Sequence, residues 1–263
     1  MNFNIGDLVT RKSYDNDTVF KIINIEEDIA YLKGVNIRLY ADSDIDDLVL
    51  YDKKEKELIE NDNRQFKGVK IVGKLNRDEY FYLPGKILHI DGDKDYLDRC
   101  LKFYKDANIL AYGIHSKEDD IHNNIKKYLE DTNPDIVVIT GHDAYYKKKG
   151  NKSNSNAYRN SSNFIKAIKE ARKYEKAHDK LIIIAGACQS NYEELIRAGA
   201  NFASSPKRIN IHALDPAIIA STIGLSDKSE DIDLIGILSK TKYGPDGVGG
   251  IKTKGTMYVG YPR

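Results

Sequence analysis

Hydrophobic and polar residues alternate in short runs over residues 1–50 of the chain. Asp, Asn and Gly separate these runs, which is typical of β-strands joined by tight turns. The clearest runs are DLVTRK (7–12), TVFKIINI (18–25), IAYLKGV (29–35) and IRLYAD (37–42). About five short strands in this length predict a small β-barrel over residues 1–62.

The pattern then changes. Residues 51–63, YDKKEKELIENDN, are strongly charged and form either a short helix or a solvated linker. Residues 63–84 connect the barrel to the rest of the chain and contain pieces of strand, FKGVKIVGK and YFYL, before Pro84. The IGDLV opening, followed by a turn and a second strand, is a common start of SH3-like barrels. We therefore expect the N-terminal module to be SH3-like, as an analogy of pattern that carries no function.

From residue 85 onward, apolar strands alternate with amphipathic helices. The expected strands lie in GKILHIDGD (85–93), ILAYGIH (109–115), DIVVIT (135–140), LIIIAGA (181–187), RINIHAL (208–214) and DIDLIGIL (231–238). The expected helices are DYLDRCLKFYKDA (95–107), IHNNIKKYLEDT (121–132), FIKAIKEARKY (164–174) and YEELIRAGA (192–200). This alternation predicts an α/β domain over residues 85–263, with a mostly parallel sheet and helices on both of its faces.

Two of these apolar strands end in a reactive side chain. PDIVVITGHDAY (134–145) places His142 after one strand, and KLIIIAGACQSN (180–191) places Cys188 after the next. Functional groups gather beyond the carboxyl ends of strands in open α/β sheets. Consecutive parallel strands are often neighbours, about 4.8 Å apart. We therefore expect the two side chains to approach one another at one edge of the sheet.

Such a pair has a chemical use. A thiol with a pKa of about 8.5 is only a few per cent thiolate at neutral pH. A nearby imidazole can accept its proton and later protonate a leaving amine. Cys188 is therefore the candidate nucleophile and His142 the candidate base. A candidate helix follows, with Gln189, Ser190 and Asn191 in its first turn, and its positive end would favour the thiolate.

Backbone groups complete this interpretation. The N–H groups at Cys188 and near Asp143 are candidates for an oxyanion hole. Gly141 and Gly186 leave room for the backbone of a substrate. A structural interpretation is also open, because a buried Cys in an α/β protein is usually structural and a His at a strand end is usually a satisfied polar group. The pattern alone does not decide between them.

The composition argues against several other classes of protein. Apolar residues make up 41% of the 263 residues. Charged residues make up 31%, and their charges nearly cancel, to a net charge of +1. A sizeable core can form, and we expect neither nucleic acid nor a membrane as a partner. The chain has two cysteines and no apolar run near the roughly 18 residues of a membrane span. It should be soluble and cytosolic at synthesis, with reduced thiols and no cofactor.

The two strand-end motifs resemble those of caspases, gingipains and clostripain. These enzymes place a His after one apolar strand and Ala-Cys after the next, which here are His142 and Ala187–Cys188. The resemblance implies a caspase-like fold for residues 85–263. Those enzymes usually carry Gly directly after the His, whereas here Gly141 precedes His142 and Asp143 follows it. The resemblance therefore does not fix which N–H completes an oxyanion hole.

The chain is more specifically similar to the YabG family of sporulation-specific peptidases of spore-forming Firmicutes, over nearly its whole length. The segments that carry this similarity are IGDLVTRKSY, LPGKILHIDGDKDYLDRCLKFY, AYGIHSKE, PDIVVITGHDAY, FIKAIKEARKYE and IIIAGACQSNYEELIRAGANFASSPKRINIHALDP. The resemblance implies a cysteine endopeptidase of the mother-cell cytoplasm that associates with the spore coat. It implies protein substrates among spore coat and germination proteins, cleavage after Arg, and self-cleavage.

An arginine-specific enzyme needs an acidic group in its specificity pocket. Asp215, in HALDP, is the first candidate and Asp143 the second, although a single Asp more often caps a turn or helix. Ser204 and Ser205 are candidates for the substrate groove, together with Gly186. The basic residues between 145 and 160 usually indicate a solvated loop, but loop tips are preferred sites of nicking, so this loop is a candidate site of self-cleavage. Arg64 and Arg77 are other possible sites.

The remaining candidates are weaker. His89, His115, Asp91 and Asp93 lie near strand ends but lack a recognised metal-ligand spacing, so we expect no metal site. His212 more often makes a structural hydrogen bond than a catalytic one. Two other functions stay open: a different Cys-His amidohydrolase, and a non-catalytic spore-coat binding protein.

Overall fold

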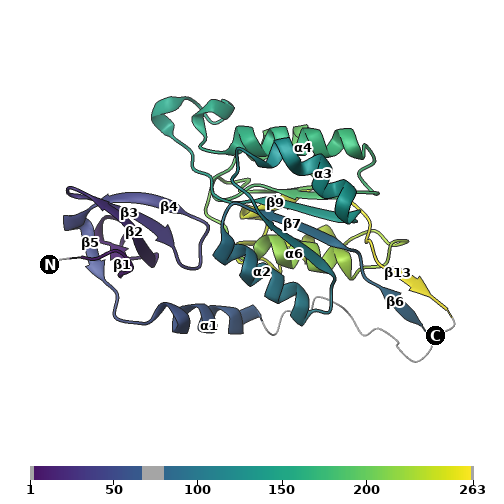
Figure 1. Ribbon diagram of the computed structural model, residues 1–263, viewed down its shortest axis with the longest axis horizontal. Helices are drawn as coiled ribbons and strands as arrows, with labels where there is room; N and C mark the ends of the chain where they lie inside the picture. Colours follow the sequence, from purple (N-terminus) through teal and green to yellow (C-terminus); the bar gives the residue numbers. More distant parts are fainter. Residues whose placement is uncertain (1–2, 67–79, 262–263) are drawn as a thin grey trace. The chain divides into compact units, whose positions relative to one another are not determined.

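The computed structural model describes residues 3–66 and 80–261. The chain divides into two compact units, Met1–Val69 and Lys70–Arg263 (Figure 1). Most of the expected strand piece FKGVKIVGK (66–74) lies outside the described residues, as does Arg77.

The first unit is built on a five-stranded antiparallel sheet in the order β4-β3-β2-β1-β5. Its strands are β1 (Leu8–Arg11), β2 (Phe20–Glu26), β3 (Ile29–Gly34), β4 (Tyr40–Asp44) and β5 (Leu48–Leu50). Alternate residues such as Ala30 and Leu32 are fully buried, as period-two patterning requires. Helix α1 (Glu55–Phe66) follows, so the charged segment is helical over much of its length. The antiparallel sheet confirms the predicted strands, and the SH3-like barrel stays a prediction.

The second unit contains a six-stranded sheet in the order β12-β11-β10-β9-β7-β8. Its strands are β7 (Ile87–Asp91), β8 (Ala111–His115), β9 (Ile136–Thr140), β10 (Ile182–Ala185), β11 (Phe202–Ser204) and β12 (Val248–Gly250). All neighbours are parallel except β12, which runs antiparallel to β11. Strands β6 (Phe81–Leu83) and β13 (Tyr258–Gly260) form a separate antiparallel pair. The mostly parallel sheet is as predicted.

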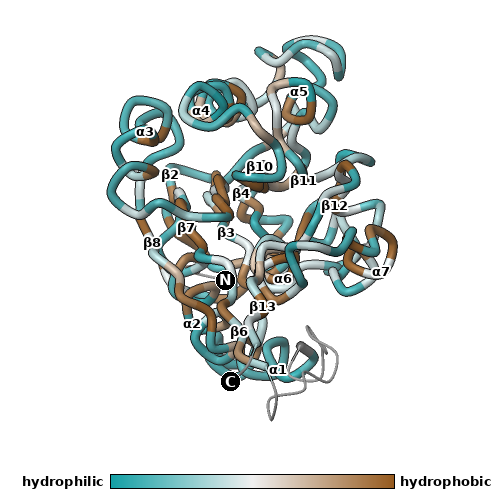
Figure 2. The backbone as a smooth tube through the Cα atoms, turned by 90° about the vertical axis from the view of Figure 1, so that its right-hand side faces the viewer, coloured by the Kyte–Doolittle hydropathy of each residue, from teal (hydrophilic) through white to brown (hydrophobic). Residues whose placement is uncertain are grey.

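Helices cover both faces of this sheet (Figures 1 and 2). One face carries α3 (Ile121–Thr132), α4 (Ser161–Tyr174) and α5 (Tyr192–Ala198). The other carries α2 (Lys94–Asp106), α6 (Asp215–Gly224) and α7 (Leu234–Leu238). Helix α6 is buried along its whole length, in keeping with its apolar sequence.

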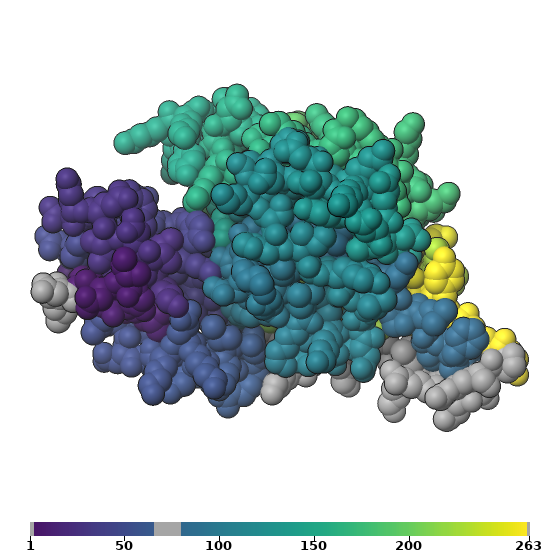
Figure 3. Space-filling model, viewed as in Figure 1, coloured from purple at the N-terminus to yellow at the C-terminus, as the bar shows by residue number. Residues whose placement is uncertain are grey.

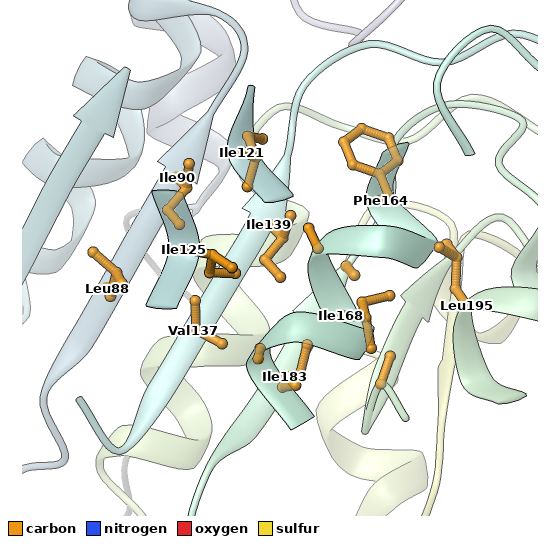
Figure 4. Close-up of a cluster of buried hydrophobic side chains, with 14 of the residues drawn as sticks. Leu88, Ile90, Ile121, Ile125, Val137, Ile139, Phe164, Ile168, Ile183 and Leu195 are labelled. Atoms are coloured by element: carbon orange, nitrogen blue, oxygen red, sulfur yellow. The ribbon is translucent and has the colours of Figure 1, made fainter. Parts of the chain in front are cut away.

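The core under α3 and α4 shows how the sequence pattern produces this packing. Alternate residues of the central strands face these helices, while Phe164 and Ile168 lie four positions apart on one side of α4. Figure 4 shows these side chains meeting between the sheet and the helices. The members of the cluster that are labelled there are Leu88, Ile90, Ile121, Ile125, Val137, Ile139, Phe164, Ile168, Ile183 and Leu195.

The strand order reverses at one defined place in the sheet. β7 lies between β8 and β9, so the chain leaves β7 in one direction and returns to its other side. Ligands of open α/β sheets bind beyond the carboxyl ends of the strands at such a switch point. The residues that follow β7 and β9 therefore stand where a functional site is expected.

Two predicted strands are wrong. Residues 208–214 form a turn and loop that leads into α6, and within 231–238 the last five residues are helix α7. Neither segment pairs in the six-stranded sheet, and Asp233 caps α7 by accepting the N–H of Gly236 at 3.0 Å. The first of these segments bonds the turn after β10, where Gln189 N–H donates to Ile209 O at 3.0 Å. Apolar residues alone did not separate these segments from strands.

Candidate active site

His142 and Cys188 follow two strands that pair in parallel. Ile139 of β9 is the partner of Ala185 of β10, and each of the two candidates comes three residues later. The pairing continues beyond the strands, because the N–H of Gly186 donates to Ile139 O at 3.0 Å. The structure therefore brings His142 and Cys188 to the same edge of the sheet, each just beyond the end of one of two adjacent parallel strands.

The His142 imidazole lies between two carboxylates. Nδ1 is 3.4 Å from Glu118 Oε1, and Nε2 is 3.4 Å from Asp93 Oδ2. The ring of Tyr96, on α2, packs beside it at 5.7 Å between centroids. His142 is 2% exposed, so these contacts are made in a nearly dry environment. The arrangement stabilises a positive charge on the ring.

The pKa directions agree with this geometry. Burial lowers the pKa of His142, but the carboxylates of Asp93 and Glu118 outweigh burial and raise it above its ordinary value. Burial raises the pKa of Glu118, and its hydrogen bonds with His142 outweigh burial and lower it. A protonated ring and an ionised carboxylate thus support each other.

Cys188 lies in a sharp turn and is fully buried. The backbone is left-handed on both sides of it, at Gly186 (φ 102°) and at Gln189 (φ 57°). The N–H of Ile211 donates to Cys188 Sγ at 3.3 Å, and Sγ lies 3.8 Å from Ile211 O. An N–H that donates to sulfur favours the thiolate.

Helix α5 begins at Tyr192, as the run YEELIRAGA (192–200) predicts, but its first turn does not include the residues next to Cys188. Gln189, Ser190 and Asn191 form the turn before it. Cys188 therefore does not stand at its first turn, and the expected help from the positive end of this helix is wrong. Gln189 lies in the turn before α5 because its left-handed backbone, with positive φ, cannot continue into a helix.

Asp143 is a buried junction of three segments. Its Oδ1 accepts the N–H groups of Ala144 and Asn160, and its Oδ2 accepts the hydroxyls of Ser161 and Ser190. Burial raises the pKa of Asp143, and these four hydrogen bonds oppose that rise. The carboxylate ties the loop after β9 to the start of α4 and to the turn after Cys188.

The candidate substrate-binding residues are also interior. Asp215 is buried at the start of α6, where Oδ2 accepts the N–H of His212 and Oδ1 that of Lys242. Ser205 is left-handed and buried, and its hydroxyl accepts the N–H of Gln189 at 2.9 Å. Ser204 ends β11 and is 3% exposed.

Close packing around Gly186 leaves no room for a side chain. A Cβ at this position would lie 2.8 Å from Leu195 Cδ1 and 3.2 Å from Ser204 Cβ. Its left-handed backbone and this lack of space both exclude larger residues.

The other histidines near the strand ends have structural partners. His89 Nδ1 lies 2.8 Å from the Tyr104 hydroxyl, and Nε2 lies 3.4 Å from Asp91 Oδ2. His212 Nδ1 accepts the N–H of Leu214. Among residues 3–66 and 80–261, no group of three or more His, Cys, Asp or Glu side chains is placed to hold a metal ion.

A surface cavity of about 340 Å³ opens beside the turn that follows Cys188. Neither Cys188 nor His142 lines it. Its walls come from the basic loop, from α5 and from the segment after β11, and carry both charges. They comprise Lys152, Ser153, Asn191, Glu193, Glu194, Arg197, Pro206, Lys207 and Arg208.

Comparison with known proteins decides the family. The model of the YabG peptidase U57 family matches residues 4–262. The chain belongs to this family. It is also 44% identical over 286 aligned positions to the sporulation-specific protease YabG of Bacillus subtilis (strain 168), covering 100% of this chain and 99% of that relative. Membership in the YabG family supports a peptidase with a role in sporulation.

In the part of the chain that the structure describes, no helix is both long and apolar enough to cross a membrane.

Sequence reasoning missed Glu118. It lies in a charged stretch, SKEDD, between β8 and α3, where an acidic residue usually faces solvent. The available signal was indirect: Gly92 follows β7 and Gly141 follows β9, and paired glycines at neighbouring strand ends indicate that a third group enters between them.

Proposed function

We propose that this member of the YabG family is a cysteine endopeptidase in which Cys188 is the nucleophile and His142 the general base and acid. One observation carries the proposal. His142 and Cys188 each lie three residues beyond a residue of the Ile139–Ala185 pair, at the carboxyl end of a parallel sheet. A thiol and an imidazole at matching positions of adjacent strands are suited to proton transfer.

The reaction follows from these groups. One His142 nitrogen must first exchange its carboxylate contact for the Cys188 thiol. The thiol proton then passes to that nitrogen, and the thiolate attacks the carbonyl carbon of the scissile peptide. His142 then donates its proton to the leaving amine, which departs and leaves a thioester on Cys188. Water, deprotonated by His142, hydrolyses the thioester and restores the thiol. Backbone N–H groups of Cys188 and Asp143 would stabilise the oxyanion.

Substrate binding must open the site. Cys188 and His142 are 0% and 2% exposed, and the backbone of Ile211 lies against the sulfur. A peptide carbonyl can reach Cys188 only if segment 209–212 moves aside.

The proposal includes a preference for arginine before the cleaved bond, which the family resemblance implies. Asp215 is the acid that we propose for its recognition. Asp143 is less suited, because its carboxylate already accepts four hydrogen bonds that tie three segments together. Asp215 accepts the N–H groups of His212 and Lys242. Variants Asp215→Ala and Asp143→Ala should be compared on arginyl, lysyl and neutral reporters. Arginine preference retained by both variants would exclude these two acids.

The biological setting belongs to the same proposal. We propose spore coat and germination proteins as substrates, met in the mother cell and at the coat. Support comes from the Bacillus subtilis relative, a sporulation-specific protease that is 44% identical to this chain.

The two cysteines offer a matched test. Cys100 and Cys188 are both buried and form no disulfide, but Cys100 lies on α2 with Sγ 3.4 Å from Ala213 O. Cys188→Ala should lose at least about 1,000-fold in kcat/KM on an arginyl peptide, whereas Cys100→Ala should keep most of it. Full activity of Cys188→Ala would refute the cysteine mechanism.

A further inference from the structure

The Glu118 carboxylate reaches into the switch point of the sheet. It comes from the loop between β8 and α3, yet its Oε1 accepts the backbone N–H of His142 at 2.8 Å. The same oxygen lies 3.4 Å from His142 Nδ1. One carboxylate therefore fixes both the backbone and the ring of His142.

Two glycines make room for this carboxylate. A Cβ at Gly92, just after β7, would lie 2.4 Å from Glu118 Oε1. A Cβ at Gly141, just after β9, would lie 2.5 Å from the same oxygen. Both strand ends are therefore shaped around Glu118, which indicates that its position is specified by the fold.

Asp93 approaches the imidazole from its other nitrogen. Its Oδ1 caps α2 by accepting the N–H groups of Asp95 and Tyr96, and this fixes the side chain. Its Oδ2 then lies 3.4 Å from His142 Nε2. The carboxylate of Asp91 accepts the N–H of Asp93 at 3.0 Å and holds the turn in place.

We propose that Glu118 and Asp93 are positioning residues that hold the His142 imidazole between them and keep it in the protonated form. This inference rests on the proposed role of His142, and the family comparison does not assign either residue. A ring held at both nitrogens keeps one orientation. Its positive charge favours the thiolate beside it.

The groups that face His142 come from separate segments. Asp93 precedes α2 and Glu118 precedes α3, and both are carboxylates; Tyr96, on α2, is a neutral phenol. Cys188, after β10, is the proposed thiolate partner. The raised pKa of His142, in which the carboxylates outweigh burial, agrees with this set of charges.

The experiment replaces charge and keeps shape. Glu118→Gln retains an oxygen that can accept the His142 N–H. Asp93→Asn retains the helix cap, because Asn and Asp cap about equally well. Asp119→Asn is the control, since Asp119 is the exposed neighbour of Glu118 on the same loop. Thermal unfolding first establishes that each full-length variant is folded.

The first measurement is the pKa of the His142 ring by NMR of ¹⁵N-histidine-labelled chain, assigned with His142→Gln. The proposal expects Glu118→Gln and Asp93→Asn each to lower this pKa by about 1 unit, and Asp119→Asn to leave it unchanged. An unchanged pKa in both test variants would overturn the proposal, whether or not the chain is a peptidase. If a test variant fails to fold, Gly92→Ala, which displaces Glu118, takes its place.

The second measurement is the pH profile of kcat/KM on an arginyl peptide. In Glu118→Gln and Asp93→Asn we expect the alkaline limb of the profile to move to lower pH by about the same amount as the pKa of His142. We expect kcat to fall about 10-fold, with KM nearly unchanged. Wild-type profiles in both variants would overturn the positioning role while Cys188→Ala stays inactive. Full activity of Cys188→Ala would instead refute the proposed function, and the NMR result would still stand on its own.

Discussion

His142 and Cys188 stand in the same relation to the sheet: each lies three residues beyond one member of the parallel pair Ile139 and Ala185. This relation comes from the parallel register of β9 and β10, two strands that are buried on both faces of the sheet. The core that packs the sheet therefore also aligns the proposed catalytic pair.

Core packing should accordingly dominate stability. Ile168, on α4, is fully buried in the cluster of Figure 4, whereas Ile235, on α7, is 68% exposed. Ile168→Ala should lower the free energy of unfolding by about 2–5 kcal/mol, and Ile235→Ala by less than about 0.5 kcal/mol. Urea unfolding of both variants measures this. Equal losses would contradict the assignment of the core.

Asp143 should be important for stability as well as for the site. Asp143→Ala leaves two backbone N–H groups and two hydroxyls without their acceptor in a buried place. We expect a loss of about 1–3 kcal/mol in urea unfolding, against less than about 0.5 kcal/mol for the exposed Asp179→Ala. A loss no larger than the control would mean that the junction is dispensable.

The contact between His142 and Glu118 predicts how stability depends on pH. The folded pKa of His142 is raised, so its contribution is complete below its unfolded pKa and is lost as pH rises through the folded value. The folded pKa of Glu118 is lowered, so its contribution is present above its unfolded pKa and is lost as pH falls through the folded value. The pair contributes most between about pH 4.3 and 6.5.

The matching measurement is the melting temperature of wild type and of Glu118→Gln across pH. The difference between their melting temperatures should be largest near pH 5–6 and should shrink above the folded pKa of His142. Each kcal/mol of stability corresponds to about 2–4 °C of melting temperature. A difference that does not change with pH would contradict the charged contact.

The sequence predicted those elements whose pattern and local bonds agree. β7, β9 and β10 are continuous apolar runs, and a strand with helices on both faces needs such a run. Helix α2 begins within one residue of the predicted start at Asp95, and Asp93 caps it. The strands predicted at 208–214 and 231–238 are wrong, since the apolar residues there lie in a loop and in a short helix.

The site was predictable only in part, for a related reason. His142 and Cys188 follow strands directly, so strand order alone brings them together. Glu118 is brought there by a loop, and no local pattern gives the direction of a loop side chain. Its position depends on Gly92 and Gly141, which are distant in sequence.

Self-cleavage is a further expectation of the family resemblance. Residues 147–149 and 151–154 are exposed in the loop between β9 and α4, which reaches the surface in Figure 3. Exposed loop tips are preferred sites of nicking. Mass spectrometry of purified wild type should show a cut after a basic residue within 145–160, and Cys188→Ala should stay intact. Identical fragments from both would point to a contaminating protease.

The central claim, that Cys188 is the nucleophile, is tested most directly by locating a covalent label. The folded chain is treated with a peptidyl arginine chloromethyl ketone until hydrolysis stops, and the modified residue is found by peptide mass mapping. The account predicts one adduct, on Cys188, and its loss in His142→Ala. Complete inhibition with Cys188 unmodified, or an adduct on Cys100 instead, would contradict it.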